Sequence, residues 1–397
     1  MMTSTAVPEH ATVVGAYSLR LPPVIHAGDG VAGRLAPEVA RLGRRPLLIT
    51  DPVVGRMAFL IELERQLVDA GLAVARFDAI PGEPTTTEVE QGLAALRAHG
   101  GDCVVAIGGG SVLDTGKAVA IMATHPGRIP DYLGSDRFSR PRLPLVAVAT
   151  TAGTGSEVTR FTVITDPDTS VKMLITDNRL IPDVAIADPV LTHGCPRSVT
   201  ASTGLDALTH AIEAYVSRRA TPSSDLFALG AARQIGRWLE RAWQDGADAV
   251  ARGQVMIGAL HAGIAFSNAS VALVHGMSRP IGAYFHVPHG IANAMLLPVV
   301  LRWSLAAAPE RYRDLAAAVG LSVAGTPAAA GARLADWVAE LAHRLQVPSL
   351  TGYGLDPDRV RAVAPRMAAD ALASGSPSNN PRIPTQDEIV ALYEQAL

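Results

Sequence analysis

The 397-residue chain is 48% hydrophobic and 18% charged, a length and composition that predict a soluble globular protein with a large core and two domains. Its formal net charge is −3 at pH 7 and its lysines and arginines form no local run, so we expect neither nucleic acid nor an anionic membrane as a partner. The start, MMTSTAVPEHATVVG, lacks the basic and apolar regions of a signal peptide, and apolar stretches of about a dozen residues are too short to span a bilayer, which predicts a cytoplasmic protein.

The cysteine content limits the kind of metal site that the chain can form. Cys103 and Cys195 are the only cysteines in the sequence. Two cysteines exclude a disulfide framework and a thiolate metal cluster. Any transition metal must therefore be bound by histidines and carboxylates.

The first half of the chain alternates short apolar runs with amphipathic stretches. Helical periodicity is present in residues 58–72 and 87–100. Strands that are buried on both faces and joined by crossover helices form a parallel, doubly wound sheet, so we expect an α/β domain here. The expected strands are PLLITD (46–51), AVARFDAI (73–80), CVVAIGGG (103–110), PLVAVATT (144–151), FTVITD (161–166) and DVAIADP (183–189).

The character of the sequence changes from about Ala201 onward. Segments rich in Ala, Leu and Arg repeat with the helical period and contain almost no β-branched runs, which predicts an all-helical domain. The Pro- and Gly-containing segment ADPVLTHGCPRS connects the two halves near residues 190–200. We therefore expect an α/β domain over residues 1–195 and a helical domain over residues 196–397.

A glycine-rich loop follows one of the expected strands. The strand CVVAI runs into GGGS and then into a helix with Ser111 as the predicted N-cap, which offers backbone N–H groups and a positive helix end to a phosphate. Gly108 and Gly110 fit the dinucleotide pattern G-x-G, but Leu113 occupies its last glycine position. The loop also departs from a Walker A motif at Ser111 and Ala118. A phosphate site and a plain strand-to-helix turn both remain open.

A second loop, TTAGTGSE (150–157), ends the strand PLVAVA with threonine and serine hydroxyls and two glycines. Ligands of parallel sheets bind at these carboxyl ends, and two converging loops favour a dinucleotide. Asp51 ends an earlier strand, where a carboxylate could accept a hydrogen bond from a ribose 2′-hydroxyl and repel a 2′-phosphate. The alternative for Asp51 is a turn former or helix cap.

Candidate metal ligands lie in the helical half. In STGLDALTHAIEAYVS (202–217), Asp206 and His210 are four residues apart, so on a helix both side chains project from one face. HGMSRPIGAYFHVPHG (275–290) adds three histidines in a segment interrupted by Pro and Gly. Aspartate and neutral imidazoles without thiolates suit Fe²⁺ or Zn²⁺. Taken singly, the aspartate could instead be a helix cap and the histidine a packed core residue.

These motifs together resemble the iron-containing (group III) alcohol dehydrogenase family, and they cover nearly the whole chain in order. The resemblance implies a Rossmann-like N-terminal domain, an all-helical C-terminal domain and an active site in the cleft between them. The matching segments are GGGSVLDTGKA, TTAGTGSEVTRFTVITD, IPDVAIADPVLT, TGLDALTHAIEAYVS, HGMSRPIGAYFHVPHGIANAMLLP and NPRIPT.

The resemblance also implies the ligands of one divalent metal and the residues around NAD. The implied metal ligands are Asp206, His210, His275 and His289. The implied cofactor residues are Gly109, Gly110, Ser111 and Asp114 near the pyrophosphate and its helix, Thr150, Thr151 and Thr154 near the phosphates and nicotinamide, and Lys172 at the nucleotide. Asp51 matches the family's ribose-binding acid, which favours NAD over NADP, and the family implies a homodimer or a higher homo-oligomer.

Arg279 departs from the family pattern. Many members have a histidine at this position, four residues after the His of the HG motif, where it is thought to assist proton transfer. Arginine cannot deliver a proton at neutral pH, so we consider His286 or a water relayed through a ribose hydroxyl for that step. His286 could equally be an ordinary solvent-facing residue. Arg279 would suit a substrate with a carboxylate, phosphate or phosphonate, or it could pair with a nearby acid or the cofactor.

We therefore expect metal-dependent, reversible hydride transfer between NAD(H) and a small primary alcohol or aldehyde. Three alternatives stay open at this stage. The first is a metal-dependent lyase or synthase of the dehydroquinate synthase type, which uses NAD only transiently. The second is a metal-assisted hydrolase of phosphorylated substrates, and the third is a nucleotide-binding protein without catalysis.

Overall fold

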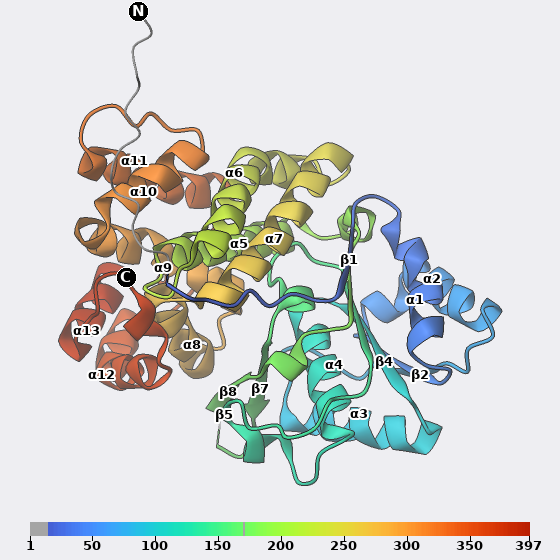
Figure 1. The fold of residues 1–397 in the computed structure, drawn as a ribbon. Helices are drawn as coiled ribbons and strands as arrows, with labels where there is room; N and C mark the ends of the chain where they lie inside the picture. The colour runs from blue at the N-terminus through green and yellow to red at the C-terminus, as the bar shows by residue number, and fades with distance from the viewer. Residues whose placement is uncertain (1–14, 170) are drawn as a thin grey trace, which may run out of the picture.

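The computed structural model describes residues 15–169 and 171–397 of the chain. Strands and helices both occur up to residue 187, and every regular element from residue 189 to the C-terminus is helical. Figure 1 shows the sheet-containing part on one side and the helical part on the other, with α5, α6 and α7 between them. The α/β and helical halves expected from the sequence are both present.

The main sheet has six strands, all parallel. Its order is β1 (Val24–Ala27), β9 (Val184–Ala187), β6 (Leu145–Ala149), β4 (Cys103–Gly108), β2 (Pro46–Ile49) and β3 (Ala75–Phe77). All residues of β2, β4, β6 and β9 are buried, which explains why these strands read as continuous apolar runs rather than alternating ones.

Helices cover both faces of this sheet. The first four helices are α1 (Leu35–Leu42), α2 (Ala58–Asp69), α3 (Thr86–His99) and α4 (Gly110–Met122). One face packs with α1 and α2 into one apolar cluster, and the other packs with α3 and α4 into a second cluster. Successive residues of β4 alternate between the two, since Val105 enters the first cluster and Ala106 the second. The sheet is therefore doubly wound, as the sequence predicts.

A second, smaller sheet contains one strand that we expected in the main sheet. Its order is β5 (Gly134–Ser135), β8 (Val171–Thr176) and β7 (Phe161–Asp166). The expectation that residues 161–166 join the parallel sheet is wrong, because β7 pairs antiparallel with β8. Only four residues separate these two strands, too few for the crossover that a parallel pair needs.

Nine α-helices form the second half. They are α5 (Arg197–Val216), α6 (Pro222–Gln244), α7 (Ala249–Ala269), α8 (Leu273–Phe285), α9 (His289–Ser304), α10 (Pro309–Ala318), α11 (Pro327–Arg344), α12 (Pro357–Ala373) and α13 (Gln386–Gln395). Several begin at a Thr or Asp whose side chain accepts a backbone N–H of the first turn, followed by a proline, as at Thr221, Thr326 and Asp356.

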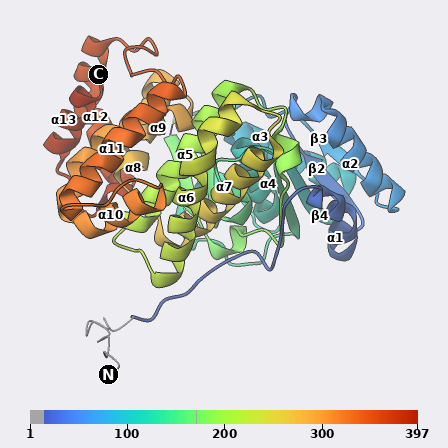
Figure 2. The ribbon, with the colours of Figure 1, turned by 90° about the horizontal axis from the view of Figure 1, so that it is seen from above.

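Helix α7 joins the two halves of the molecule, as the view from above in Figure 2 shows. Met256, Leu260 and Ile264 follow one another at intervals of four residues, so they form one stripe on the helix. This stripe belongs to the apolar cluster that the main sheet forms with α3 and α4. Val255 and Phe266 belong to the large cluster of the helical half. Because one helix contributes to both cores, it fixes the two halves against each other.

Within residues 15–169 and 171–397, two helical stretches have the length and hydropathy of a membrane span. They are Ala249–Ala269, which is α7, and His289–Ala307, which begins with α9. Most of the apolar window in α7 and half of that in the second stretch are buried inside the protein. Core helices of globular proteins have the same properties, and both stretches contribute to the core described above.

Candidate metal centre and nucleotide site

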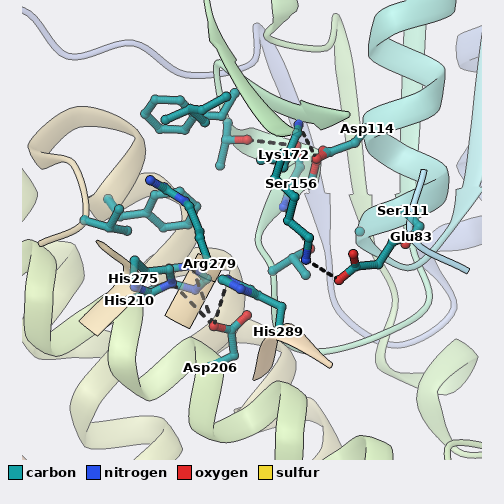
Figure 3. A pocket seen from close by; sticks show the side chains of 18 of the residues that line it. Glu83, Ser111, Asp114, Ser156, Lys172, Asp206, His210, His275, Arg279 and His289 are labelled. Atoms are coloured by element: carbon teal, nitrogen blue, oxygen red, sulfur yellow. Dashed lines mark hydrogen bonds and ion pairs between the residues drawn. The ribbon is translucent and has the colours of Figure 1, made fainter. Parts of the chain in front are cut away.

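A cavity of about 210 Å³ lies between the two halves of the molecule. Residues of the α/β half, including Ser111, Thr154 and Lys172, form one wall, and residues of α5, α7, α8 and α9 form the other. Figure 3 shows Asp206, His275 and His289 on one side of it and Lys172 with Glu83 on the other. The cavity therefore brings together the candidate metal ligands and most of the candidate nucleotide residues.

Asp206 and His210 both lie in the middle of α5, buried on the face that points into the cavity. Asp206 is the tenth residue of α5, which excludes its interpretation as a helix cap, because a cap lies at the first turn. His210 stacks on Phe266 of α7 with ring centroids 4.1 Å apart. The four-residue spacing therefore places the two side chains next to each other, as predicted.

His275 and His289 reach the same point from two other helices. His275 lies in the first turn of α8, and His289 is the first residue of α9. From Oδ1 of Asp206, Nε2 of His275 is 3.5 Å away, Nε2 of His289 3.9 Å and Nε2 of His210 4.0 Å. Asp206, His210 and His275 each offer a ligand atom within 4.8 Å of the other two.

These separations fit a bound divalent metal. In a tetrahedral site with bonds of about 2.1 Å, neighbouring ligand atoms are about 3.4 Å apart, close to the distances around Asp206. Nδ2 of Asn293 also lies 2.7 Å from Oδ1 of Asp206 and 3.1 Å from Nε2 of both His275 and His289. The three candidate ligand atoms therefore lie around one small space that the amide of Asn293 borders.

Glu213 holds His275 in place, and the sequence analysis missed it. It lies on α5, two turns after Asp206, and its Oε2 is 2.6 Å from Nδ1 of His275. It also accepts the backbone N–H groups of Ala272 and Val274 at the start of α8. The carboxylate therefore caps α8 and leaves Nε2 of His275 free to face Asp206. Its seven-residue spacing from Asp206, on the same helix face, is the signal that could have identified it.

Burial and neighbouring charges set the protonation of the cluster. Burial lowers the pKa of His210 to about 4 and that of His289 to about 3, despite the nearby Asp206. Burial also acts to lower the pKa of His275, but Glu213 and Asp206 outweigh it and raise that pKa. Burial opposes ionisation of Asp206, yet the three histidines hold its pKa well below the usual range. An ionised aspartate with neutral imidazoles is the form that binds metal, so a metal would displace the proton that Glu213 and Asp206 favour on His275.

The two glycine loops meet at the opposite wall. A Cβ on Gly110 would lie 2.8 Å from Cγ2 of Thr154, and one on Gly109 would lie 3.5 Å from Oγ1 of Thr151. Glycine at these positions lets the second loop approach the start of α4, whose N–H groups face the cavity. Thr150 is buried and donates its backbone N–H to the carbonyl of Gly108, which joins the two loops at their base.

The predicted N-cap of this helix was wrong by two residues. Helix α4 begins at Gly110 with Gly109 as its N-cap and no side-chain cap, whereas we expected Ser111. Because Ser111 is already inside the first helical turn, it contributes to the cavity wall. An uncapped first turn keeps its backbone N–H groups available for a ligand.

Asp114 is engaged by the protein itself. Its Oδ1 accepts a hydrogen bond from Oγ of Ser156, and its Oδ2 accepts the backbone N–H of Val163. The residue lines the cavity, but both oxygens connect α4 to the second loop and to β7. Asp114 therefore shapes the nucleotide wall through these contacts.

Lys117, which the sequence analysis did not select, completes this connection. It is fully buried and donates hydrogen bonds to Oγ of Ser156, Oγ1 of Thr159 and the carbonyl of Phe161. Burial lowers its pKa to about 8, and burial raises the pKa of nearby Glu157 to about 7. These buried charged groups fix the second loop behind the cavity.

Asp51 and Lys172, both expected at the nucleotide, differ in their relation to the cavity. Oδ1 of Asp51 accepts the backbone N–H groups of Val53 and Val54, so the residue forms the turn after β2, and Asp51 is outside the cavity lining. Lys172 lies on β8 and lines the cavity, with Nζ 2.6 Å from Oε1 of Glu83. Lys172 therefore reaches the wall where we expected it.

Arg279 lines the cavity, and His286 does not. Arg279 lies one turn after His275 on α8, and its guanidinium donates a hydrogen bond of 2.9 Å to Oγ of Ser376. His286 follows the last residue of α8, is exposed and adopts a left-handed conformation with φ of 56°. The structure thus brings Arg279 to the candidate site and leaves His286 at the surface.

Glycine loops at the ends of parallel strands, facing an aspartate and three histidines across one cavity, are the arrangement of a nicotinamide-dependent dehydrogenase with a divalent metal. The chain belongs to the iron-containing alcohol dehydrogenase family. Residues 22–189 match the family described as iron-containing alcohol dehydrogenase, and residues 200–397 match the C-terminal family of Fe-containing alcohol dehydrogenases.

Individual relatives of known name match this chain over nearly its whole length. The 1,3-propanediol dehydrogenase of Klebsiella pneumoniae is 40% identical over 358 residues, which cover 89% of this chain and 92% of the relative. A solved 1,3-propanediol oxidoreductase superposes with a TM-score of 0.93 at 38% identity, covering 96% of this chain and 100% of the other. Sulfoacetaldehyde reductase from Bifidobacterium kashiwanohense, solved with NAD⁺, gives a TM-score of 0.84 at 29% identity, with coverages of 96% and 99%.

Proposed function

We propose that this protein catalyses reversible hydride transfer between NAD(H) and a small primary alcohol or aldehyde, with one divalent metal, Fe²⁺ or Zn²⁺, as a second cofactor. The observation that carries the proposal is the convergence of four candidate ligand atoms opposite the glycine loops, in one cavity. The proposed ligands are Asp206, His210, His275 and His289. A metal bound there would supply a Lewis acid for the substrate oxygen.

The chain's own residues would orient both reactants. The first turn of α4 and Thr154 would bind the pyrophosphate, with Thr150 and Thr151 supporting the second loop, and Lys172 would approach the nucleotide. Phe161 and Phe266 stack with ring centroids 5.8 Å apart and form an apolar wall that would exclude water from a bound nicotinamide. This arrangement would place the hydride donor against the ligand cluster.

The proton path follows from the positions of Arg279 and His286. Arg279 stands in the cavity and cannot act as an acid at neutral pH. His286 is exposed beyond the end of α8. Both observations support a proton path through a ribose hydroxyl and water rather than through His286.

The small cavity supports a short substrate. Named relatives act on 1,3-propanediol and on sulfoacetaldehyde, both of them short molecules. We also propose a cytoplasmic homo-oligomer, a dimer or larger, with units over residues 1–195 and 196–397. The net charge of −3 supports a protein without nucleic acid or membrane partners.

The test is NADH consumption with a panel of short aldehydes, using metal-free protein reconstituted in parallel with Fe²⁺ or Zn²⁺. Metal-dependent oxidation of NADH is the expected result. Tight NAD binding without turnover of any aldehyde would point to lyase chemistry of the dehydroquinate synthase type instead. Turnover of a phosphorylated substrate with no change in nicotinamide absorbance would point to a hydrolase.

A further inference from the structure

We propose that the physiological aldehyde carries a terminal oxyanion, a carboxylate, phosphate or phosphonate, and that Arg279 binds this group. The inference rests on the proposed function and adds the substrate class to it. Three observations support it: the place of Arg279 in the cavity, the partners of its guanidinium and the charges that surround it.

The place of Arg279 is fixed by the packing of α8. A Cβ on Gly276 would lie 2.7 Å from Cγ of Pro377, so the glycine allows the short helix Ser376–Asn379 to approach α8 closely. One turn later, Arg279 reaches Oγ of Ser376 and lines the cavity that contains His275 and His289. Arg279 and His275 are four residues apart on one helix face, about 6 Å along the axis, a distance that a short carbon chain can bridge.

The guanidinium forms no hydrogen bond or ion pair with a carboxylate of the described residues. Its one side-chain hydrogen bond within residues 15–169 and 171–397 goes to a neutral hydroxyl, and it forms no ion pair with their carboxylates. A guanidinium presents five N–H donors, so most of them remain for a ligand. Removing such a charge from water without a partner costs free energy, which a bound anion would recover.

The other charges of the cavity do not compensate for Arg279. Lys172, the other cationic side chain in the lining, is already paired with Glu83 at 2.6 Å. On the same helical wall as Arg279, the carboxylates of Asp206 and Glu213 would balance the two charges of a divalent metal. The positive charge of Arg279 therefore has no carboxylate in the described part of the chain to balance it beside the ligand cluster, where the substrate would bind.

The shape of arginine determines what it would bind. Its planar fork matches a carboxylate or phosphonate through two parallel hydrogen bonds. The substrate would place its carbonyl at the ligand cluster and its oxyanion at Arg279, with its carbon chain against Phe266 and Val271. A neutral aldehyde would fill the same space but leave the guanidinium without a partner.

The experiment compares an anionic aldehyde with a neutral one of the same carbon skeleton, 4-oxobutanoate and its methyl ester, with metal-loaded full-length enzyme and NADH. The variants are Arg279→Gln, Arg279→Lys and Ser376→Ala, and Arg366→Gln is the matched control because Arg366 lies exposed on α12 outside the cavity. Thermal unfolding and NADH binding are measured for each variant, so that a folding defect is recognised.

The wild-type enzyme is expected to favour the carboxylate by about 10- to 100-fold in kcat/KM, the size of a charge-assisted pair. Arg279→Gln should remove this preference, Arg279→Lys should retain part of it, and Arg366→Gln should leave it intact. Succinate should inhibit the wild type and inhibit Arg279→Gln much less.

Equal use of the two aldehydes by the wild type would overturn the inference without any variant. A preference that survives in Arg279→Gln, or one that Ser376→Ala removes equally, would also overturn it, since Arg279 would then serve as an anchor for residues 376–379. Propanal is assayed alongside. Turnover of propanal without any preference for the anion rejects this inference alone, whereas no NADH consumption with any aldehyde rejects the proposed function.

Discussion

Oε2 of Glu213 lies 2.6 Å from Nδ1 of His275, and the same carboxylate accepts two backbone N–H groups at the start of α8. One buried side chain thus fixes the helix that carries the histidine and the orientation of the ring. The hydrogen on Nδ1 faces Glu213, which leaves a lone pair on Nε2 for a metal.

Glu213→Gln should weaken metal binding about 10- to 100-fold, because the amide no longer selects the tautomer of His275. Metal affinity is measured by competition with a chromogenic chelator, separately from activity. Glu240→Gln, a change at a partly exposed position on α6, is the control and should bind metal as the wild type does. Unchanged affinity in Glu213→Gln would show that the carboxylate acts only as a helix cap.

His275→Ala should abolish metal retention and aldehyde reduction and leave nucleotide binding largely intact, since the glycine loops lie on the opposite wall. Metal content after gel filtration and the fluorescence of bound NADH measure the two properties independently. Full activity in a metal-free His275→Ala enzyme would refute the metal-dependent mechanism.

Lys117→Met should destabilise the protein by about 2–4 kcal/mol, because it removes three hydrogen bonds from a fully buried site. Since these bonds hold residues 156–161 behind the cavity, we also expect weaker NADH binding. Denaturant unfolding and NADH titration measure the two effects. If stability falls while NADH binds as before, the nucleotide wall does not depend on this lysine.

Glu157→Gln should change how stability depends on pH. Burial raises the pKa of Glu157 from 4.5 to about 7. The folded state therefore binds the proton more tightly than the unfolded state, and this stabilisation, present below pH 4.5, is lost as the pH rises through 7. Relative to the wild type, the glutamine variant should gain up to roughly 3 kcal/mol across this range.

The measurement is urea unfolding of metal-free protein from acidic to mildly alkaline pH. The difference between wild type and variant is the quantity compared, so that the titration of the buried histidines cancels. Parallel stability curves would mean that Glu157 titrates normally.

Asp51→Ser should raise the ratio of NADP⁺ to NAD⁺ use, as measured by kcat/KM, by about tenfold or more, because it removes a carboxylate that would repel a 2′-phosphate. The loss of the turn contacts to Val53 and Val54 is a separate effect. Asp51→Asn is the matched control for it, since the amide oxygen can still accept both N–H groups. An unchanged ratio in both variants would assign Asp51 to the turn alone.

The sequence predicts the strands that are buried on both faces, because short continuous runs rich in valine and isoleucine are typical of buried parallel strands. Three other strands escaped prediction, the two-residue β5 and the longer β1 and β8. VIHA in β1 is partly exposed throughout, and VKMLIT in β8 carries a lysine. Their places depend on pairing partners distant in the chain, β9 for the first strand and β7 for the second, which no local pattern reveals.

For the site, the four-residue spacing of Asp206 and His210 predicts their adjacency from helix geometry alone. The approach of α8 and α9 to α5 depends on tertiary contacts, so the places of His275 and His289 came from family resemblance. Glu213 was missed although its seven-residue spacing puts it on the helix face of Asp206, and Asn293 was missed because an amide in a buried helix has no distinctive pattern. Only the packed structure shows which atoms they contact.

Gly155 in the second glycine loop and Gly263 in α7 meet with no side chain between them. A Cβ on Gly155 would lie 2.5 Å from Cα of Gly263, and Gly155 has a φ of 61° that favours glycine. Thr154 precedes Gly155 at the nucleotide wall, and Phe266, one turn after Gly263, stacks on His210. The distance between the nucleotide wall and the metal ligands is therefore set by a direct contact between two backbone segments. Substitutions of side chains elsewhere in either core do not alter this contact directly.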